Sequence, residues 1–160
     1  MVILLMGVTG SGKTTIGQAL AESLHWQFVD ADDFHPPANV AKMRAGIPLD
    51  DCDRAPWLAI LRAQITCWLT SATEVVLACS ALKQAYRDEL VLSPDVRVVY
   101  LRGRSELIAR RLEHRHGHYM DPGLLSSQLA TLEEPHDALS VDVDDRVPDI
   151  VGRIREGLEL

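Results

Sequence analysis

The segment Gly7–Thr14, GVTGSGKT, restricts most strongly what this chain can fold into. It follows the apolar run Val2–Met6. After it, apolar residues recur at every fourth position, at Ile16, Leu20 and Leu24. This pattern predicts a loop between a buried strand and a helix. The segment matches G-x-x-x-x-G-K-[ST] at every fixed position, so its glycines can turn backbone N–H groups toward an anion at the positive end of that helix. It therefore predicts a phosphate-binding loop.

Two side chains of this loop suit a nucleoside triphosphate. Lys13 can reach the β- and γ-phosphates, and the Thr14 hydroxyl can hold Mg²⁺. The nucleotide-binding residues are expected to be Gly7, Val8, Thr9, Gly10, Ser11, Gly12, Lys13, Thr14 and Thr15. The motif alone does not separate kinases, GTPases and ATPases. Guanine-specific GTPases use an Asn-Lys-x-Asp element, and the chain's single asparagine, Asn39, is followed by Val40. A small-molecule or nucleotide kinase is the class that remains.

Apolar runs alternate with helical patterns along the chain's 160 residues. Strands are expected at Val2–Met6, Gln27–Asp30, Val75–Cys79, Arg97–Leu101 and Leu139–Val143. Helices are expected over 14–24, 56–70 with Pro56 near the start, 82–92, 105–115, 123–131 and 147–158, with one more short helix within 35–49. The alternation predicts an α/β fold, a parallel sheet with helices on both faces, in a single domain spanning 1–160. Ligands of such sheets bind outside the carboxyl ends of the strands.

Acidic residues follow the second expected strand, in VDADDF. With strand alternation, Asp30 and Asp32 share a face and Asp33 does not. One of the two carboxylates can hold Mg²⁺ through water, and the other can accept the proton of an attacking hydroxyl. An acidic turn that caps a helix is the structural alternative.

Basic residues follow the third strand and the fourth. Lys83 and Arg87 are four apart, so one helix face would present two cations near the site, unless they are ordinary solvated charges. Five arginines lie between residues 102 and 118: Arg102, Arg104, Arg110, Arg111 and Arg115. Arg111 and Arg115 lead into HGHYMDPG and could neutralise a transferring phosphoryl group from a lid at about 112–124. The alternating His114, His116 and His118 have no acidic or cysteine partner at metal-ligand spacing, so no metal site is expected there.

Composition narrows the remaining possibilities. The net charge of −7 argues against a nucleic-acid partner, because phosphate backbones attract basic surfaces. Three cysteines without CxxC spacing suggest reduced thiols in a cytosolic protein, and Cys79 suggests a buried small hydrophobe. No secretory signal is visible, and no apolar run approaches the roughly 20 residues that span a bilayer.

The motifs together resemble the gluconokinase family, relatives of shikimate kinase among the P-loop kinases. The specific blocks are DADDFHPPANVAKMRAGIPLDDCDRAPWL and ACSALKQAYRD, supported by GVTGSGKTT, VYLRG, GHYM and LLSSQLATLEEP in the same order. The resemblance runs through nearly the whole chain. It implies a five-stranded parallel sheet, a cytoplasmic enzyme, commonly a homodimer, and ATP- and Mg²⁺-dependent phosphorylation of the 6-hydroxyl of D-gluconate. A related kinase for shikimate or a nucleoside monophosphate, or a non-catalytic nucleotide-binding regulator, is the alternative.

The resemblance also implies roles for individual residues. Asp30 would assist Mg²⁺ beside Thr14, and Asp32 would orient or deprotonate the sugar hydroxyl. Lys13 of the phosphate loop and the lid arginines Arg111 and Arg115 would act on the phosphoryl group. The residues expected to border the sugar acid are Asp32, His35, Arg44, Lys83, Arg87, His118 and Gln128. His114 and His116 are histidines that the family pattern does not need.

Overall fold

The computed structural model describes residues 1–114 and 122–160. Its centre is a five-stranded parallel sheet in the order β2-β3-β1-β4-β5. The strands are β1 (Val2–Met6), β2 (Gln27–Asp30), β3 (Val75–Ala78), β4 (Val96–Arg102) and β5 (Leu139–Asp142). The five strands expected from the apolar runs are confirmed, with bounds that shift by one residue at most. The predicted lid falls largely on 115–121, outside the described residues.

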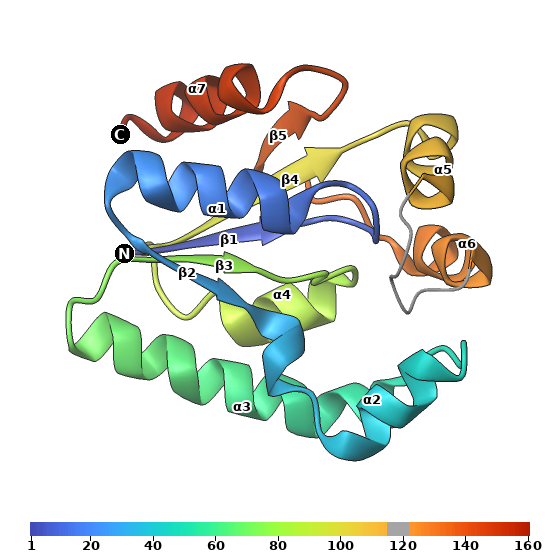
Figure 1. Ribbon diagram of the computed structural model, residues 1–160. Helices are drawn as coiled ribbons and strands as arrows, with labels where there is room; N and C mark the ends of the chain where they lie inside the picture. Colours follow the sequence, from blue (N-terminus) through green and yellow to red (C-terminus); the bar gives the residue numbers. More distant parts are fainter. Residues whose placement is uncertain (115–121) are drawn as a thin grey trace.

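Helices cover both faces of the sheet (Figure 1). They are α1 (Lys13–Leu24), α2 (Pro37–Arg44), α3 (Asp51–Thr70), α4 (Gln84–Leu90), α5 (Ser105–Glu113), α6 (Pro122–Thr131) and α7 (Val147–Leu158), with a 3₁₀ turn η1 (Ala31–Phe34) after β2. In Figure 1, α1 and α7 lie above the sheet, and α3 and α4 lie below it. The α/β architecture inferred from the alternating pattern is thus confirmed.

The two faces of β1 belong to two separate cores. Ile3 and Leu5 pack with α1 and α7, whereas Leu4 and Met6 pack with α3 and α4. All five β1 side chains are fully buried. A strand covered by helices on both faces has no polar side, which explains why VILLM is apolar at every position.

Helix α3 begins earlier than its apolar stripe predicts. Pro56 was expected near its start, but the helix begins at Asp51. Asp50 accepts a hydrogen bond from the Asp53 N–H at 2.7 Å, and the Asp53 carboxylate accepts one from the Asp50 N–H at 3.1 Å. This reciprocal capping box satisfies two N–H groups and starts the helix ahead of the proline.

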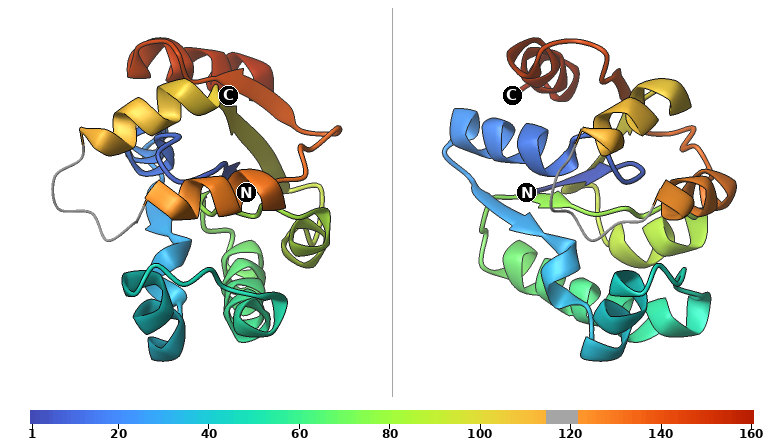
Figure 2. Two further views of the ribbon diagram at one scale, coloured as in Figure 1. Left: turned by 90° about the vertical axis from the view of Figure 1, so that its right-hand side faces the viewer. Right: turned by 45° about the vertical axis from the view of Figure 1, so that its right-hand side comes forward.

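The two short helices α5 and α6 lie together at the carboxyl edge of the sheet (Figure 2). Ile108 of α5 and Leu125 of α6 form a small core with Val8 of the phosphate loop and Leu82 after β3. In the sheet order β2-β3-β1-β4-β5, the connection after β1 leads to β2 on one side, whereas the connection after its neighbour β3 leads to β4 on the other side. Such a switch point leaves a crevice at the carboxyl ends of the strands.

Candidate active site

A cavity of about 440 Å³ lies in this crevice. Its walls come from the phosphate loop, the end of β2 with η1, the segment between α2 and α3, the end of β3, and α5 and α6. Nine residues expected from the sequence line it: Thr9, Gly10, Gly12, Lys13, Thr14, Asp30, Asp32, His35 and Gln128. The structure therefore brings residues that are far apart in sequence to one site.

The phosphate loop is shaped for an anion. Gly10 and Gly12 have φ angles of 79° and 94°, in the left-handed region that favours glycine, and Gly12 directly precedes α1. Lys13 donates from Nζ to the carbonyl oxygens of Gly7 and Val8, at 2.9 Å each. The buried Ser11 hydroxyl has no hydrogen-bond partner among the described residues. A tight loop with an ammonium folded onto it and the start of a helix beside it suits phosphate oxygens.

Thr14 and Asp30 lie in contact at the floor of the cavity. Thr14 Oγ1 is 3.3 Å from Asp30 Oδ2, and the Asp32 N–H donates to Asp30 Oδ1 at 3.0 Å. Burial raises the pKa of Asp30 above its usual value, and the neighbouring charges of Asp32 and Asp33 add to this effect. A hydroxyl and a carboxylate next to each other, with further negative charges nearby, are suitable ligands for Mg²⁺. Within 1–114 and 122–160, no three or more His, Cys, Asp or Glu side chains are grouped so that they could hold a metal ion by themselves, so phosphate and water would complete the coordination.

Asp32 projects into the cavity from η1, not from a strand. The strand β2 ends at Asp30, so Asp32 is not part of it. Strand alternation was expected to place the two aspartates on one face, and that explanation is wrong. A tight 3₁₀ turn nevertheless brings both to the cavity wall. Partial desolvation at the cavity wall opposes ionisation of Asp32, but contact with His35 and the charge of Lys13 hold its pKa below the usual value. Asp32 is therefore an anion at neutral pH.

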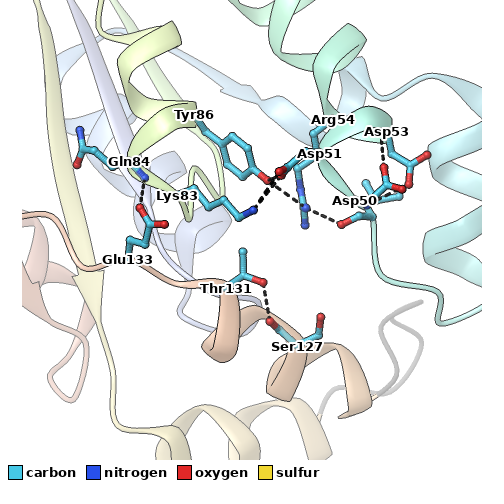
Figure 3. Close-up of polar contacts among 11 residues, drawn as sticks. Asp50, Asp51, Asp53, Arg54, Lys83, Gln84, Tyr86, Ser127, Thr131 and Glu133 are labelled. Atoms are coloured by element: carbon cyan, nitrogen blue, oxygen red, sulfur yellow. Dashed lines mark hydrogen bonds and ion pairs between the residues drawn. The ribbon is translucent and has the colours of Figure 1, made fainter.

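Arg54 supplies a cation that the sequence interpretation missed. It lines the cavity from the first turns of α3. Its Nη1 donates to the carbonyl of Leu49 and to the Tyr86 hydroxyl at 3.3 Å, and the guanidinium carbon lies 5.5 Å from the centre of the Tyr86 ring. The Tyr86 hydroxyl in turn donates to Asp51 (Figure 3). Arg54 falls inside the specific block DRAPWL, but no spacing pattern in the sequence distinguishes it from a surface charge.

Lys83 and Arg87 are not among the residues that line the cavity. Lys83 precedes α4 and pairs with Asp51 at 3.0 Å (Figure 3). Arg87 is 2% exposed and donates to the carbonyl oxygens of Ala81, Leu82 and Glu133. The expectation of one helix face with two cations toward the site is corrected, because Arg87 turns inward to bind backbone oxygens.

The remaining expected residues fall into three groups: residues at the phosphate loop, a residue away from the cavity, and residues outside the described parts of the chain. Gln128 accepts a hydrogen bond at Oε1 from the Thr9 N–H at 2.6 Å, so α6 is tied directly to the phosphate loop. Arg111 donates to the Val143 carbonyl, and a Cβ on Gly12 would lie 3.9 Å from its Nη1, so it stands beside the loop. Arg44 is exposed on α2 and does not line the cavity. Arg115, His116 and His118 lie outside the described residues.

Comparisons with known proteins identify the family of this chain. The shikimate kinase family model matches residues 9–149. A Xenopus tropicalis protein named "Probable gluconokinase" is 44% identical, covering 96% of this chain and 91% of its own. The gluconokinase of Gluconobacter oxydans is 46% identical over 84% of this chain and 76% of its own. The crystal structure of a gluconokinase from Sinorhizobium meliloti superposes with a TM-score of 0.88 at 43% identity, covering 99% of this chain and 91% of that one.

The family match over residues 9–149 includes Lys13 and Thr14 of the phosphate loop, the aspartate turn and the α3 segment that carries Arg54. A mycobacterial APS kinase has the same fold with a TM-score of 0.72 at only 16% identity, so the fold is shared by proteins of much lower sequence similarity. The chain belongs to the gluconokinase family, within the shikimate kinase group of P-loop kinases.

Proposed function

We propose that this protein transfers the γ-phosphoryl group of ATP to the 6-hydroxyl of D-gluconate, which gives 6-phospho-D-gluconate. The observation that carries the proposal is the cavity itself, in which the phosphate loop, an ionised Asp32 and the cation Arg54 face one space. The chain is 44% and 46% identical to the Xenopus tropicalis and Gluconobacter oxydans relatives, which carry gluconokinase names, and this similarity supports the same reaction. The whole chain, 1–160, would act as one catalytic domain.

At the phosphate-binding part of the site, the side chain of Lys13 would change its hydrogen-bond partners when ATP binds. Lys13 would leave the carbonyl oxygens of Gly7 and Val8 for the phosphates of ATP. Backbone N–H groups of Gly7–Thr15 would hold the phosphates, and Thr14 with Asp30 would hold Mg²⁺. When bound, Mg²⁺ neutralises charge on the phosphate oxygens. Arg111, beside the loop, would stabilise charge on the group in transfer, and Arg115 keeps the same proposed role.

The acceptor end would recognise an acid that carries many hydroxyls. Asp32 would accept a hydrogen bond from the attacking hydroxyl and hold it in line with the γ-phosphorus. Arg54, with its guanidinium fixed by Leu49 and Tyr86, would bind the carboxylate. His35 and Gln128 would complete the walls. Arg44, Lys83 and His118 remain proposed substrate contacts, whereas Arg87 does not, because its side chain is buried and its Nη1 and Nη2 groups donate to backbone carbonyls inside the fold.

An acceptor panel tests the proposal. Purified protein with ATP and Mg²⁺ is offered D-gluconate, shikimate and nucleoside monophosphates, with ADP release as the first measurement and ³¹P NMR of the product as the second. ADP release that depends on gluconate, with a phosphomonoester at carbon 6, is the expected result. Turnover of shikimate or a nucleotide alone would replace the acceptor, and no acceptor-dependent release would favour a nucleotide-binding regulator.

We also propose that the protein works as a cytoplasmic homodimer, as the family resemblance implies. In the described parts of the chain, no helix has the length and apolar character needed to cross a membrane. Light scattering coupled to gel filtration would measure the oligomeric state directly.

A further inference from the structure

His35 is held in one orientation behind Asp32. It follows η1, and its side chain is only 4% exposed. The imidazole stacks on the Trp57 indole, with ring centres 4.3 Å apart and 12° between the planes. Trp57 is itself fixed, because its Nε1–H donates to the Ala31 carbonyl at 2.7 Å. The stacking therefore fixes the plane of the His35 ring, and the contacts of its two nitrogens distinguish the two orientations that share this plane.

The buried Asn39 determines which nitrogen of His35 carries the proton. Asn39 is 3% exposed, and its Nδ2 donates to the backbone carbonyl of Asp53 at 2.8 Å. A carbonyl oxygen only accepts, so the amide nitrogen of Asn39, not its oxygen, must face it. The same nitrogen lies 3.2 Å from Nδ1 of His35. An amide NH₂ group only donates, so Nδ1 must be the accepting nitrogen, and the proton of the neutral ring is on Nε2.

Nε2 of His35 is the ring nitrogen that lies next to the carboxylate of Asp32, 3.6 Å from Oδ1. We propose that Asn39 is a positioning residue that holds His35 in the Nε2–H tautomer, so that His35 offers Asp32 a donor. Asp32 is then left with acceptor oxygens for the hydroxyl of the substrate. The opposite tautomer would set two N–H groups against each other at Nδ1 and turn a lone pair toward the carboxylate. This inference rests on the proposed function, because it assigns Asp32 to the acceptor hydroxyl.

The chain of contacts continues into the start of α3. The Asp53 carboxylate is bound by Lys42 Nζ at 2.8 Å to each oxygen and closes the capping box of α3. The backbone carbonyl that orients Asn39 thus belongs to a residue anchored on both sides. Arg54 is the next residue in the chain. The same turn of α3 therefore carries the cation Arg54 of the cavity wall and, through Asn39 and His35, supports the contact with the Asp32 carboxylate.

The first test reads the tautomer directly in the wild-type protein, without substrate. Long-range ¹H–¹⁵N correlation spectra of histidine-labelled protein are recorded above about pH 7.5, where an ordinary histidine is neutral. The His35 signals are assigned by their loss in His35→Gln. We expect an unprotonated Nδ1 and a protonated Nε2. A protonated Nδ1, or a mixture of the two tautomers, would overturn the inference whatever the acceptor of the enzyme is.

The second test asks whether Asn39 acts through His35. Asn39→Asp replaces the donor by an acceptor and should lower kcat by about tenfold or more with little change in the KM for ATP. His35→Gln places an amide donor near the position of Nε2, and an amide has no tautomers. In that background we expect Asn39→Asp to lower kcat by less than about twofold.

An equal loss from Asn39→Asp in both backgrounds would show that Asn39 only supports the fold, which contradicts the proposal. Thermal unfolding of all four proteins measures the structural cost separately. If Asn39→Asp does not fold, the tautomer measured in the wild type still decides. Because that spectrum needs no substrate, failure of the inference and failure of the gluconate assignment remain distinguishable.

Discussion

At the scale of single residues, two carboxylates that are neighbours in sequence differ in what they contact. The Asp32 side chain is 56% exposed, faces His35 and feels the charge of Lys13. Asp33 also lines the cavity, but the structure gives it no contact with His35. The difference suggests that only Asp32 meets the acceptor hydroxyl, although both are exposed enough to be substituted without harm to the fold.

Asp32→Asn is therefore expected to lower kcat by about a hundredfold or more. The amide cannot take up the proton of the substrate hydroxyl, and its hydrogen bond to that hydroxyl is weaker than that of a carboxylate. ATP affinity should change by less than about threefold, since the phosphate loop is untouched. Steady-state kinetics and calorimetric titration of a non-hydrolysable ATP analogue measure the two effects. Asp33→Asn removes the same charge one residue away and should retain most of the activity. Equal losses in both variants would remove Asp32 from its role.

Arg87 illustrates a residue whose charge serves the fold. Its guanidinium holds three backbone oxygens, two of them at the turn after β3, where Ala81 has a φ of 42°. We expect Arg87→Met to lower the free energy of unfolding by about 2–4 kcal/mol, because buried carbonyls lose their donors. Urea unfolding measures it. At temperatures where the variant is folded, the KM for the acid should stay near the wild-type value, and a selective rise in that KM would restore Arg87 to the substrate site.

At the scale of elements, two helical glycines have opposite surroundings. A Cβ on Gly17 of α1 would lie 2.6 Å from Cε2 of Phe28 on β2 and 3.2 Å from Leu5 of β1. A Cβ on Gly152 of α7 would meet nothing within 4 Å. Gly17 thus lets α1 approach the sheet, and with it the phosphate loop that α1 follows. Gly152 only weakens its helix.

The matched pair Gly17→Ala and Gly152→Ala tests this contrast. Gly17→Ala should destabilise the protein by about 1–3 kcal/mol, because the ring of Phe28 and the helix must move apart. Gly152→Ala should stabilise it by about 0.5–1 kcal/mol. Urea midpoints with equal slopes measure both values. A stabilised Gly17→Ala variant would show that α1 does not need this close approach.

The elements also show what the sequence could and could not predict. The strand β1 could be predicted because a strand covered by helices on both faces is apolar at every position, but the order of the strands in the sheet could not be predicted from the apolar runs. The start of α3 could not, because the capping box of Asp50 and Asp53 competes with a proline whose usual place is the first turn. The η1 turn and the burial of the Arg87 side chain could not be predicted either, because both depend on hydrogen bonds between segments that are far apart in sequence. Arg54 became a site residue only when Tyr86 of α4 was placed beside it.

At the scale of the whole molecule, the cavity is continuous with the core. Cys79, just after β3, lines the cavity and is 1% exposed. Burial, with the nearby charge of Asp32, raises the pKa of its thiol to about 12 from 9.0. The other cysteines, Cys52 and Cys67, are exposed. Global unfolding therefore lowers the pKa of the Cys79 thiol, because it exposes this thiol to water.

The raised pKa of Cys79 should make the free energy of unfolding decrease at alkaline pH. Between pH 9.0 and about 12 the unfolded chain loses the Cys79 proton while the folded protein keeps it, so the unfolded state gains as pH rises. Below pH 9.0 the thiol is protonated in both states and its contribution is complete. The free energy of unfolding should fall by up to about 1.4 kcal/mol per pH unit above that point through this one group.

Urea unfolding at about pH 8, 9 and 10 in wild type, Cys79→Ala and Cys67→Ala measures the effect. Cys79→Ala should be less stable at the lowest pH, because a small cavity is left, but its stability should fall less steeply with pH than that of the wild type. Cys67→Ala should follow the wild-type slope, because the exposed thiol does not pass from core to water. Tyrosines and lysines that ionise in the same range affect all three proteins alike. Parallel curves for wild type and Cys79→Ala would mean that the thiol beside the acceptor cavity already meets solvent in the folded state, and that the cavity is open to water as far as the end of β3.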